Sequence, residues 1–509
     1  MSPYQSERVK NVKWEKLQLR CFPSVPCIPP GEISMRRARI VCTLGPATGS
    51  GRMLERLLRA GMDVARLNMS YGTHEDHRGY IARLRALSKK MGRPVGILLD
   101  LQGVKIRISD VKDPGVFLKK GSRVRLRRGD RPSTAETVFI PYAGLLKDVR
   151  AGHRVLVNDG LVELLVTGRK GNALEARVRQ GGFLTSRKGV NLPDSVIRAG
   201  SFTAKDRRDL QFGIDEGVDA FALSFVTRAG DISVLKRHLA RGGCTAPIIA
   251  KIERPSAVDH IEEILDVADG IMVARGDLGV ELSAAAVPIL QKDMIRRANR
   301  KQRLVITATQ MLESMRTSPV PTRAEAADVA NAILDGSDAV MLSGETSVGR
   351  YPVEAVKTME DIILEAEEQG SFFQARLPVP EPVLGKDPDR SSFAVAHAAV
   401  RAAADIKAKC IVAFTRSGYT AGLLAKFRPG LPIVAFTSDT ATINRMKFYW
   451  GVVPLYVKHL DNTDAMIREV ERTLVKTRHV KRGDDVVITA SLPMADTGKT
   501  NFLKVHRIS

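Results

Sequence analysis

The feature that most constrains the fold is an eightfold alternation that begins near residue 38. Short apolar, β-branched runs alternate with amphipathic stretches of helical periodicity, which is typical of βα units and a parallel sheet. The runs are ARIVCTL, MDVARLNM, PVGILLD, VDAFALSF, APIIAKI, DGIMVA, RLVITAT and SDAVML. Eight such units predict an α/β fold with a (β/α)8 barrel, whose active site is expected at the C-terminal ends of the strands.

Polar residues stand at or just past the ends of seven runs, and their spacing supports the barrel. They are Asn68, Asp100, Ser224, Lys251, Asp277, Thr309 and Ser343. Five of the six successive gaps are 26 to 34 residues, about one βα unit each, whereas the gap from Asp100 to Ser224 is 124 residues. The excess predicts an insertion at 104–199. Its strand-like stretches, rich in Val and Gly, predict a small β domain that closes over the barrel mouth as a lid.

The rest of the chain divides at two Pro-rich stretches. We expect an N-terminal arm over 1–35, barrel segments over 36–103 and 200–370, a linker over 371–389 and a C-terminal α/β regulatory domain over 390–509.

Composition excludes several classes of protein. The formal charge of +23 could attract a polyanion, but aromatic residues make up only 5% and the basic residues are dispersed, so we expect no nucleic-acid partner. No apolar run approaches the roughly 20 residues of a membrane helix, so we expect no membrane partner. Five scattered cysteines fit a reducing cytoplasm better than a disulfide framework.

Two carboxylates at neighbouring strand ends suggest a metal site. Glu253 and Asp277 are 24 residues apart, and Lys251 precedes Glu253 by two. Mg²⁺ is usually held by one or two carboxylates together with substrate oxygens. An ordinary ion pair between Lys251 and Asp277 explains the pattern equally well, so both interpretations stay open here.

Further groups at this rim fit an anionic substrate. Arg66 could stabilise charge on a transferring phosphoryl group, or it could instead pair with Asp100 or Asp63. Backbone N–H groups at Gly276 would bind a small carboxylate, and Thr309 adds a hydroxyl. Together these groups indicate a small, doubly anionic substrate bound with a metal.

The order of motifs resembles the pyruvate kinase family. The matching stretches include GMDVARLNMSYGTHEDH, NDGLVEL, RKGVNLP, AKIERPSAV, DGIMVARGDLGVE, TATQMLESM and PTRAEAADVANAILDGSDAVMLSGET. The resemblance is strong over 38–370 and weaker over 390–509. It implies transfer of a phosphoryl group from phosphoenolpyruvate to ADP, giving ATP and pyruvate in the last step of glycolysis. It also implies Mg²⁺ or Mn²⁺ as cofactor and a homotetramer.

The resemblance also assigns roles to residues. It implies that Glu253 and Asp277 hold the metal and that Lys251, Arg66 and Thr309 are catalytic. It implies substrate binding by Arg66, Lys251, Gly276, Asp277 and Thr309, and nucleotide binding by Asn68, Arg107 and Lys188.

One departure from the family bears on monovalent cations. Many members carry DTKGPEIR where this chain has DLQGVKIR. The resemblance places the K⁺ region at Asn68, Ser70, Asp100, Leu101 and Lys105. Lys105 stands at the glutamate position, and its ammonium is itself a tethered monovalent cation. We therefore expect that K⁺ is not required.

The C-terminal segment TRSGYTA opens a predicted helix with a hydroxyl-rich turn. In the family this position binds a phosphorylated effector, which would assign Thr415, Arg416, Ser417, Gly418 and Thr420. A plain N-cap is the alternative. The second effector loop, LPMADTGKTN, lacks the tryptophan and arginine of the fructose-bisphosphate type, so we expect a monophosphate effector or none.

Two other functions compete with this prediction. One is a different metal-dependent barrel enzyme acting on phosphoenolpyruvate or pyruvate, which would need no lid. The other is a catalytically silent paralogue that binds metabolites or RNA.

Overall fold

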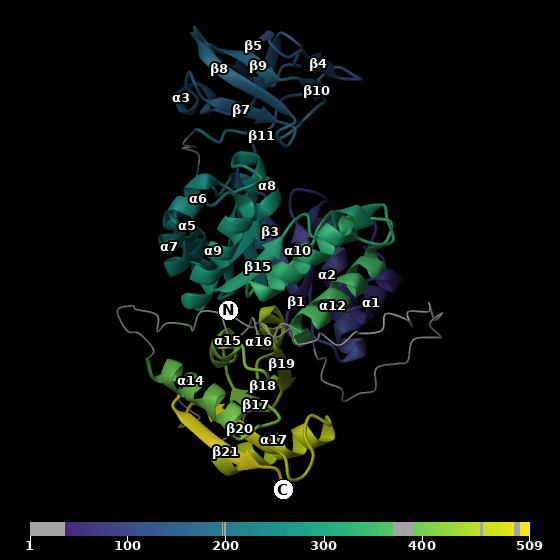
Figure 1. The fold of residues 1–509 in the computed structure, drawn as a ribbon, viewed down its shortest axis with the longest axis vertical. Helices are drawn as coiled ribbons and strands as arrows, with labels where there is room; N and C mark the ends of the chain where they lie inside the picture. Colours follow the sequence, from purple (N-terminus) through teal and green to yellow (C-terminus); the bar gives the residue numbers. More distant parts are fainter. Residues whose placement is uncertain are drawn as a thin grey trace, which may run out of the picture.

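Three bodies stack along the long axis of the molecule: a β lid, a barrel and an α/β domain (Figure 1). The computed structural model describes residues 36–195, 197, 200–369, 380, 390–458, 462–492 and 499–509. The predicted N-terminal arm over 1–35 lies outside these residues, as does the predicted linker over 371–389 apart from residue 380. The positions at which we divide the chain into domains stay predictions.

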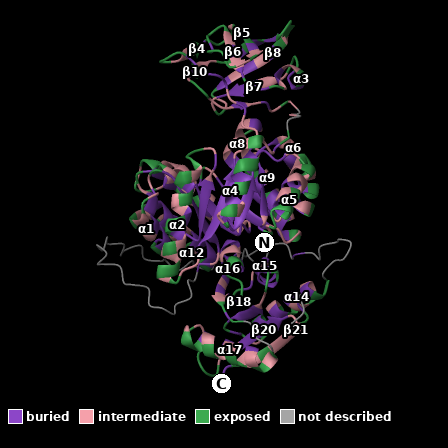
Figure 2. Ribbon diagram, turned by 180° about the vertical axis from the view of Figure 1, so that it is seen from behind, coloured by how far each residue is buried: buried purple, intermediate pink, exposed green. Residues whose placement is uncertain are grey.

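Eight parallel strands close into the predicted barrel, in the order β1-β16-β15-β14-β13-β12-β3-β2. They are β1 (Arg39–Thr43), β2 (Val64–Asn68), β3 (Gly96–Leu101), β12 (Ala220–Leu223), β13 (Ile248–Ile252), β14 (Gly270–Ala274), β15 (Leu304–Ala308) and β16 (Ala339–Leu342). Each coincides with one of the eight apolar runs, with β3 ending one residue past its run, so the predicted fold class is confirmed. Nearly every strand residue is buried (Figure 2), because the strands face side chains inside the barrel and helices outside it.

Helices surround the barrel. They are α1 (Gly51–Arg59), α2 (His74–Met91), α4 (Ala204–Asp215), α5 (Ala229–Arg241), α6 (Pro255–Asp259), α7 (Ile261–Val267), α8 (Arg275–Glu281), α9 (Val287–Arg300), η1 (Glu313–Arg316), α10 (Arg323–Leu334), α11 (Gly344–Ser347) and α12 (Pro352–Gln369). Capping boxes fix the starts of α2, α4 and α10 through Thr73, Thr203 and Thr322. The pattern of the stretch SAVDHIEEILDVA predicts one helix, but the structure divides it at His260 into α6 and α7.

The insertion between β3 and β12 forms the lid. It holds β4 (Val116–Leu118), β5 (Arg123–Arg128), β6 (Thr137–Ile140), α3 (Leu145–Asp148), β7 (Arg154–Val157), β8 (Val162–Lys170), β9 (Ala173–Gln180), β10 (Gly182–Leu184) and β11 (Val190–Asn191). Six of these strands form one sheet around their own apolar core, and β4 pairs with β10. Asn191 Nδ2 donates to Glu281 Oε1 over 3.0 Å, which ties the lid to α8 of the barrel.

The C-terminal domain is a five-stranded sheet in the order β19-β18-β17-β20-β21. Its elements are α14 (Arg390–Asp405), β17 (Ile411–Phe414), α15 (Tyr419–Lys426), β18 (Ile433–Thr437), α16 (Thr440–Arg445), η2 (Met446–Phe448), β19 (Val452–Tyr456), α17 (Thr463–Lys476), β20 (Asp485–Ala490) and β21 (Phe502–Arg507).

The C-terminal domain contacts the end of the barrel opposite the lid (Figure 1). Phe448 packs so close to Gly96 that a Cβ there would lie 2.8 Å from its ring, so the first residue of β3 has to be glycine. Buried ion pairs join Lys426 to Asp338 and Lys447 to Asp63. The domain is thus held at the N-terminal ends of the strands, which leaves their C-terminal ends to the lid.

Two smaller expectations concern cysteines and membranes. Cys42, Cys244 and Cys410 are free thiols, whereas Cys21 and Cys27 lie outside the described residues. Among the helices that the structure describes, none combines the length and the apolar character needed to cross a bilayer.

Candidate active site

A buried cluster of charges occupies the mouth of the barrel, under the lid. Arg66, Asp100 and Lys251 come from β2, β3 and β13, and Ser224 directly follows β12. They meet because parallel strands end at the same rim. Lys251 Nζ donates to Ser224 Oγ over 2.7 Å and lies 2.9 Å from Glu253 Oε1 and 3.3 Å from Asp100 Oδ1. Among the residues that the structure describes, the carboxylates that Lys251 contacts are Asp100 and Glu253, and the alternative ion pair with Asp277 is not formed.

Arg66 extends the cluster on the other side of Asp100. Its Nε and Nη2 both lie 2.7 Å from Asp100 Oδ2, and Nη1 donates to Thr43 Oγ1 over 2.9 Å. Of the two pairings considered from the sequence, the one with Asp100 is present, whereas Asp63 pairs with Arg36 at the other end of the barrel. Asp100 thus holds the two cationic catalytic candidates, Arg66 and Lys251, by ion pairs.

The charges of these groups follow from their mutual contacts. Burial alone would raise the pKa of Asp100, but Lys251 and Arg66 hold that pKa below its ordinary value. Burial works to lower the pKa of Lys251, but Asp100 and Glu253 outweigh it and raise that pKa. At neutral pH the cluster therefore keeps an ionised Asp100 carboxylate between two cationic side chains, and fixed cations of this kind can stabilise charge on a phosphoryl group.

Glu253 and Asp277 fit a divalent cation. Burial raises the pKa of Glu253; the charge of Lys251 opposes that rise, and the negative charge of Asp277 adds to it. Two carboxylates that repel one another in a buried site favour a bound cation. Glu253 Oε2 is oriented by the backbone N–H of Phe225 over 2.7 Å. No group of three or more His, Cys, Asp and Glu with metal-ligand geometry occurs within the described ranges, so substrate and water would supply the remaining oxygens.

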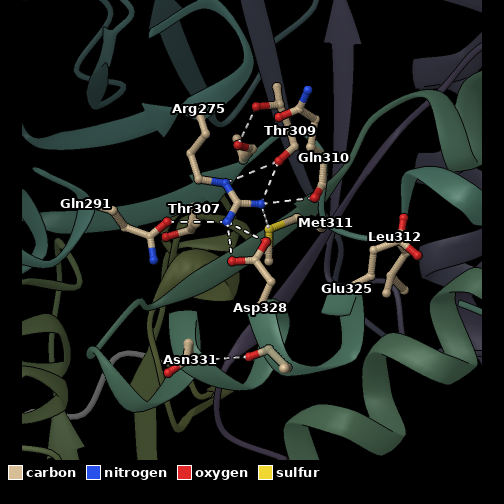
Figure 3. A network of polar contacts seen from close by, with 12 residues as sticks. Arg275, Gln291, Thr307, Thr309, Gln310, Met311, Leu312, Glu325, Asp328 and Asn331 are labelled. Atoms are coloured by element: carbon tan, nitrogen blue, oxygen red, sulfur yellow. Dashed lines mark hydrogen bonds and ion pairs between the residues drawn. The ribbon is translucent and has the colours of Figure 1, made fainter. Parts of the chain in front are cut away.

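Thr309 lies in an unusual turn after β15 (Figure 3). Thr309 and Gln310 both adopt left-handed backbone conformations, with φ of 69° and 54°. For residues other than glycine this costs on the order of 1–3 kcal/mol each, and such strain persists where surrounding contacts enforce it. The turn places Thr309 Oγ1 2.7 Å from the backbone nitrogen of Gly276, which donates to it. Thr309, Gly276 and, next along α8, Asp277 are thereby brought together as the sequence predicts.

The residues of the predicted monovalent-cation region lie at the ends of β2 and β3 and just after them. The region comprises Asn68, Ser70, Asp100, Leu101 and Lys105. Asn68 Oδ1 accepts a hydrogen bond from the backbone of Ser70, and Leu101 is fully buried. Lys105 is half-buried with its Cε close to Gly189, and within the described part of the chain its ammonium forms no ion pair with Asp100.

The two nucleotide candidates of the lid lie on neighbouring segments. Arg107 and Gly189 form an isolated antiparallel β-bridge. The backbone N–H of Ile108 donates to the carbonyl oxygen of Lys188 over 2.9 Å. Both segments lead into the end of the lid that faces the barrel (Figure 1). Lid closure would therefore carry Arg107 and Lys188 together.

The hydroxyl-rich turn before α15 is organised by its own side chains. Thr415 Oγ1 accepts from the backbone of Gly418 over 3.0 Å, and Thr420 Oγ1 lies 2.6 Å from Thr500 Oγ1. Arg416 and Ser417 are exposed. Residues 493–498 of the second predicted effector loop lie outside the described residues.

Sequence reasoning missed three residues of the site. Ser224 was marked only as a strand end, although it joins Lys251 to Asp100. Thr43 is the last residue of β1 and holds Arg66. Arg275 stands immediately before Gly276 and contacts the turn at Thr309. Ser224 and Thr43 could have been found from the rule that barrel active sites form at the C-terminal ends of the strands.

Barrel, lid and a buried cluster of Lys, Arg and carboxylates define a phosphotransferase of the (β/α)8 class. The family model "Pyruvate kinase, barrel domain" matches residues 35–356, and "Pyruvate kinase, alpha/beta domain" matches residues 393–506. The chain belongs to the pyruvate kinase family.

Individual relatives agree with the family models. A pyruvate kinase of Geobacillus stearothermophilus is 44% identical over 480 residues, covering 93% of this chain and 81% of the relative. One of Staphylococcus aureus is 42% identical over 476 residues, with the same coverage. The crystal structure of a pyruvate kinase from Cryptosporidium parvum superposes with a TM-score of 0.87 at 32% identity, covering 94% of this chain and 97% of that one. These findings confirm the predicted phosphotransferase and do not favour the competing functions.

Proposed function

We propose that the cluster at the barrel mouth transfers the phosphoryl group of phosphoenolpyruvate to ADP, with Lys251 and Arg66 as its cationic groups. The observation that carries this proposal is the position of Lys251, whose buried ammonium lies within 3.3 Å of both Asp100 and Glu253. A fixed cation at this place stabilises charge on a phosphoryl group in transit without reorganising during the reaction.

The other groups of the site bind and orient the substrate. Glu253 and Asp277 would hold Mg²⁺ or Mn²⁺, which when bound neutralises phosphate charge. The N-terminal backbone of α8 at Gly276 and Asp277, together with the Thr309 hydroxyl, would bind the substrate carboxylate. Thr309 would also face the carbon that is protonated when enolpyruvate becomes pyruvate.

The nucleotide would bind between barrel and lid. Arg107 and Lys188 would contact its phosphates, and Asn68 would contribute from the end of β2. Closure of the lid would exclude water, which favours transfer to ADP over hydrolysis.

A coupled assay tests the reaction. Purified protein with phosphoenolpyruvate, ADP and Mg²⁺ should form ATP and pyruvate in equal amounts. Pyruvate formed with inorganic phosphate in place of ATP would favour a different metal-dependent barrel enzyme that hydrolyses phosphoenolpyruvate, and no turnover would favour a silent paralogue. Replacing Mg²⁺ by Mn²⁺ in the same assay measures the metal preference.

We further propose that the enzyme works without K⁺, because Lys105 supplies a tethered positive charge. Lys105 follows β3 at the hinge of the lid, so lid closure would change its distance to Asn68, Ser70 and Asp100. Turnover in K⁺-free buffer should equal turnover in KCl, and a large activation by KCl would contradict the proposal. Lys105→Glu should create a dependence on K⁺.

Three properties implied by the family complete the proposal. The chain would form a homotetramer, which analytical ultracentrifugation can measure. A phosphorylated effector would bind the turn formed by Thr415, Arg416, Ser417, Gly418 and Thr420, and titration with sugar monophosphates would detect it. Free thiols at Cys42, Cys244 and Cys410 support a cytoplasmic location.

A further inference from the structure

Arg275, the first residue of α8, has a buried guanidinium that lies against the turn formed by Thr309 and Gln310 (Figure 3). Its Nη2 donates to the carbonyl oxygen of Thr309 over 2.7 Å and to that of Gln310 over 3.2 Å. Its Nε also donates to Thr309, over 3.3 Å. The two carbonyls that Arg275 contacts thus belong to the same two residues that adopt left-handed conformations.

The guanidinium is itself anchored from the opposite side. Nη1 lies 2.6 Å from Asp328 Oδ2 on α10 and donates to Gln291 Oε1 on α9 over 3.3 Å. All three nitrogens of Arg275 are therefore engaged, and its side chain is only 8% exposed. A planar fork can hold two successive carbonyls and a carboxylate at once, whereas the single ammonium of lysine cannot span them.

These contacts fix the distance between two strand ends of the barrel. Arg275 follows β14, whereas Thr309 follows β15. The side chain of Arg275 holds the backbone of Thr309, and the backbone of the next residue, Gly276, holds the hydroxyl of Thr309 over 2.7 Å. Thr309 is thus held to the start of α8 both by its backbone carbonyl and by its hydroxyl.

We propose that Arg275 is a positioning residue: its guanidinium keeps the turn at Thr309 and Gln310 in its left-handed conformation and so sets the Thr309 hydroxyl against the start of α8. The inference rests on the proposed function, in which this place receives the substrate carboxylate. Arg275 acts through Thr309 and Gly276 and does not touch substrate. Its loss affects phosphoenolpyruvate rather than ADP, because the nucleotide candidates lie on the lid and at the end of β2, whereas Arg275 contacts the turn after β15.

The barrel offers a matched control at the other end of the same strand. Arg303 immediately precedes β15, and its guanidinium donates to the carbonyl oxygens of Leu265 and Asp266 over 2.7 and 3.2 Å. Arg303→Lys therefore removes an equivalent pair of contacts away from the barrel mouth.

The test compares Arg275→Lys with Arg303→Lys in the full-length enzyme with Mg²⁺. Arg275→Lys should lower kcat/KM for phosphoenolpyruvate about 10- to 100-fold, with KM for ADP within about twofold of wild type. Arg303→Lys should leave kcat/KM for phosphoenolpyruvate and KM for ADP within about twofold of wild type. An unchanged kcat/KM in Arg275→Lys, or an equal loss in Arg303→Lys, would overturn the proposal.

A rescue experiment tests the turn directly. Glycine adopts left-handed conformations without strain. In a Gln310→Gly variant the left-handed turn should therefore depend less on stabilisation by the Arg275 guanidinium. Adding Gln310→Gly to Arg275→Lys should recover at least about threefold in kcat/KM relative to Arg275→Lys alone, provided that the turn is what Arg275 holds. No recovery would contradict this role.

A crystal structure of Arg275→Lys gives a readout independent of activity. Thr309 Oγ1 should move out of hydrogen-bonding distance from the Gly276 nitrogen, and an unchanged turn would overturn the proposal. Wild-type enzyme that forms no ATP from phosphoenolpyruvate and ADP would instead refute the proposed function, and the structural comparison would still decide the role of Arg275.

Discussion

Lys251 and Glu253 are two residues apart at the end of β13, and Lys251 Nζ lies 2.9 Å from Glu253 Oε1. Alternate residues of a strand point to the same side, so this spacing places an ammonium and a carboxylate together at the barrel mouth. A cation and a candidate metal ligand are thus built into one short strand.

Lys251→Met should abolish phosphoryl transfer and leave the fold intact. Methionine keeps the length of the side chain but removes the charge, so kcat should fall by at least about 10³-fold. Arg66 still neutralises Asp100 in this variant, which limits the loss of stability. A coupled ATP assay and circular dichroism measure the two effects. Turnover near that of wild type would refute the role given to Lys251.

Arg66→Lys tests whether geometry matters as well as charge. Arginine spans Asp100 and Thr43 with separate nitrogens, whereas a lysine ammonium would reach one of them at a time. We expect a loss of about 10²-fold in kcat/KM for phosphoenolpyruvate. Arg59→Lys, an exposed substitution on α1, serves as control and should have no effect. Activity of Arg66→Lys equal to that of the control would show that only charge is needed.

The barrel was predictable from sequence because its signal is local and repeated. Each of the eight strands lies in an apolar run, and the rule that sites form at the ends of strands identified Lys251, Asp277 and Thr309. The lid was predictable from one anomalous gap of 124 residues. Chain spacing alone was enough for these features because βα units have a nearly constant length.

Pairing within the site was less accessible to sequence reasoning. Spacing allowed Lys251 to pair with Asp277, whereas the structure pairs it with Asp100, 151 residues earlier in the chain. Such contacts depend on which side chains point into the mouth and on how far each reaches. The left-handed turn at Thr309 was equally hidden, because neither Thr309 nor Gln310 has the preference for such conformations that glycine has.

Asp63→Asn should destabilise the whole protein. The Asp63 carboxylate is buried among Arg36, Arg39 and Lys447, at 2.8, 3.6 and 2.9 Å. Neutralising it leaves three cations without their shared partner, which should cost about 3–5 kcal/mol in the free energy of unfolding. Urea unfolding measures the change.

Glu55→Gln is the matched control for Asp63→Asn. Glu55 pairs with the exposed Arg59 one turn away on α1, and its loss should cost less than about 0.5 kcal/mol. A similar small effect of Asp63→Asn would show that the buried cluster contributes little to stability.

Lys447 should make stability rise with pH above about pH 8. Burial lowers the pKa of Lys447 to about 8; Asp63 opposes this shift, and the cations Arg39 and Arg93 reinforce it. In the unfolded chain the pKa returns to about 10.4. Between these values the unfolded state binds a proton that the folded state has released, so the free energy of unfolding increases with pH. The full difference corresponds to about 3 kcal/mol, which is a cost to folding at pH values below about 8.

Lys447→Met removes this titration and should flatten the corresponding part of the pH profile. Relative to wild type, the variant should be most favoured at about pH 7.5 and below, and should lose most of that advantage as the pH approaches about 10.4. Urea unfolding at several pH values in this range measures the difference, with the exposed Lys90→Met as control. Profiles of wild type and Lys447→Met that run parallel would mean that Lys447 keeps its ordinary pKa in the folded protein, and that Asp63 fully offsets the cost of burying the ammonium.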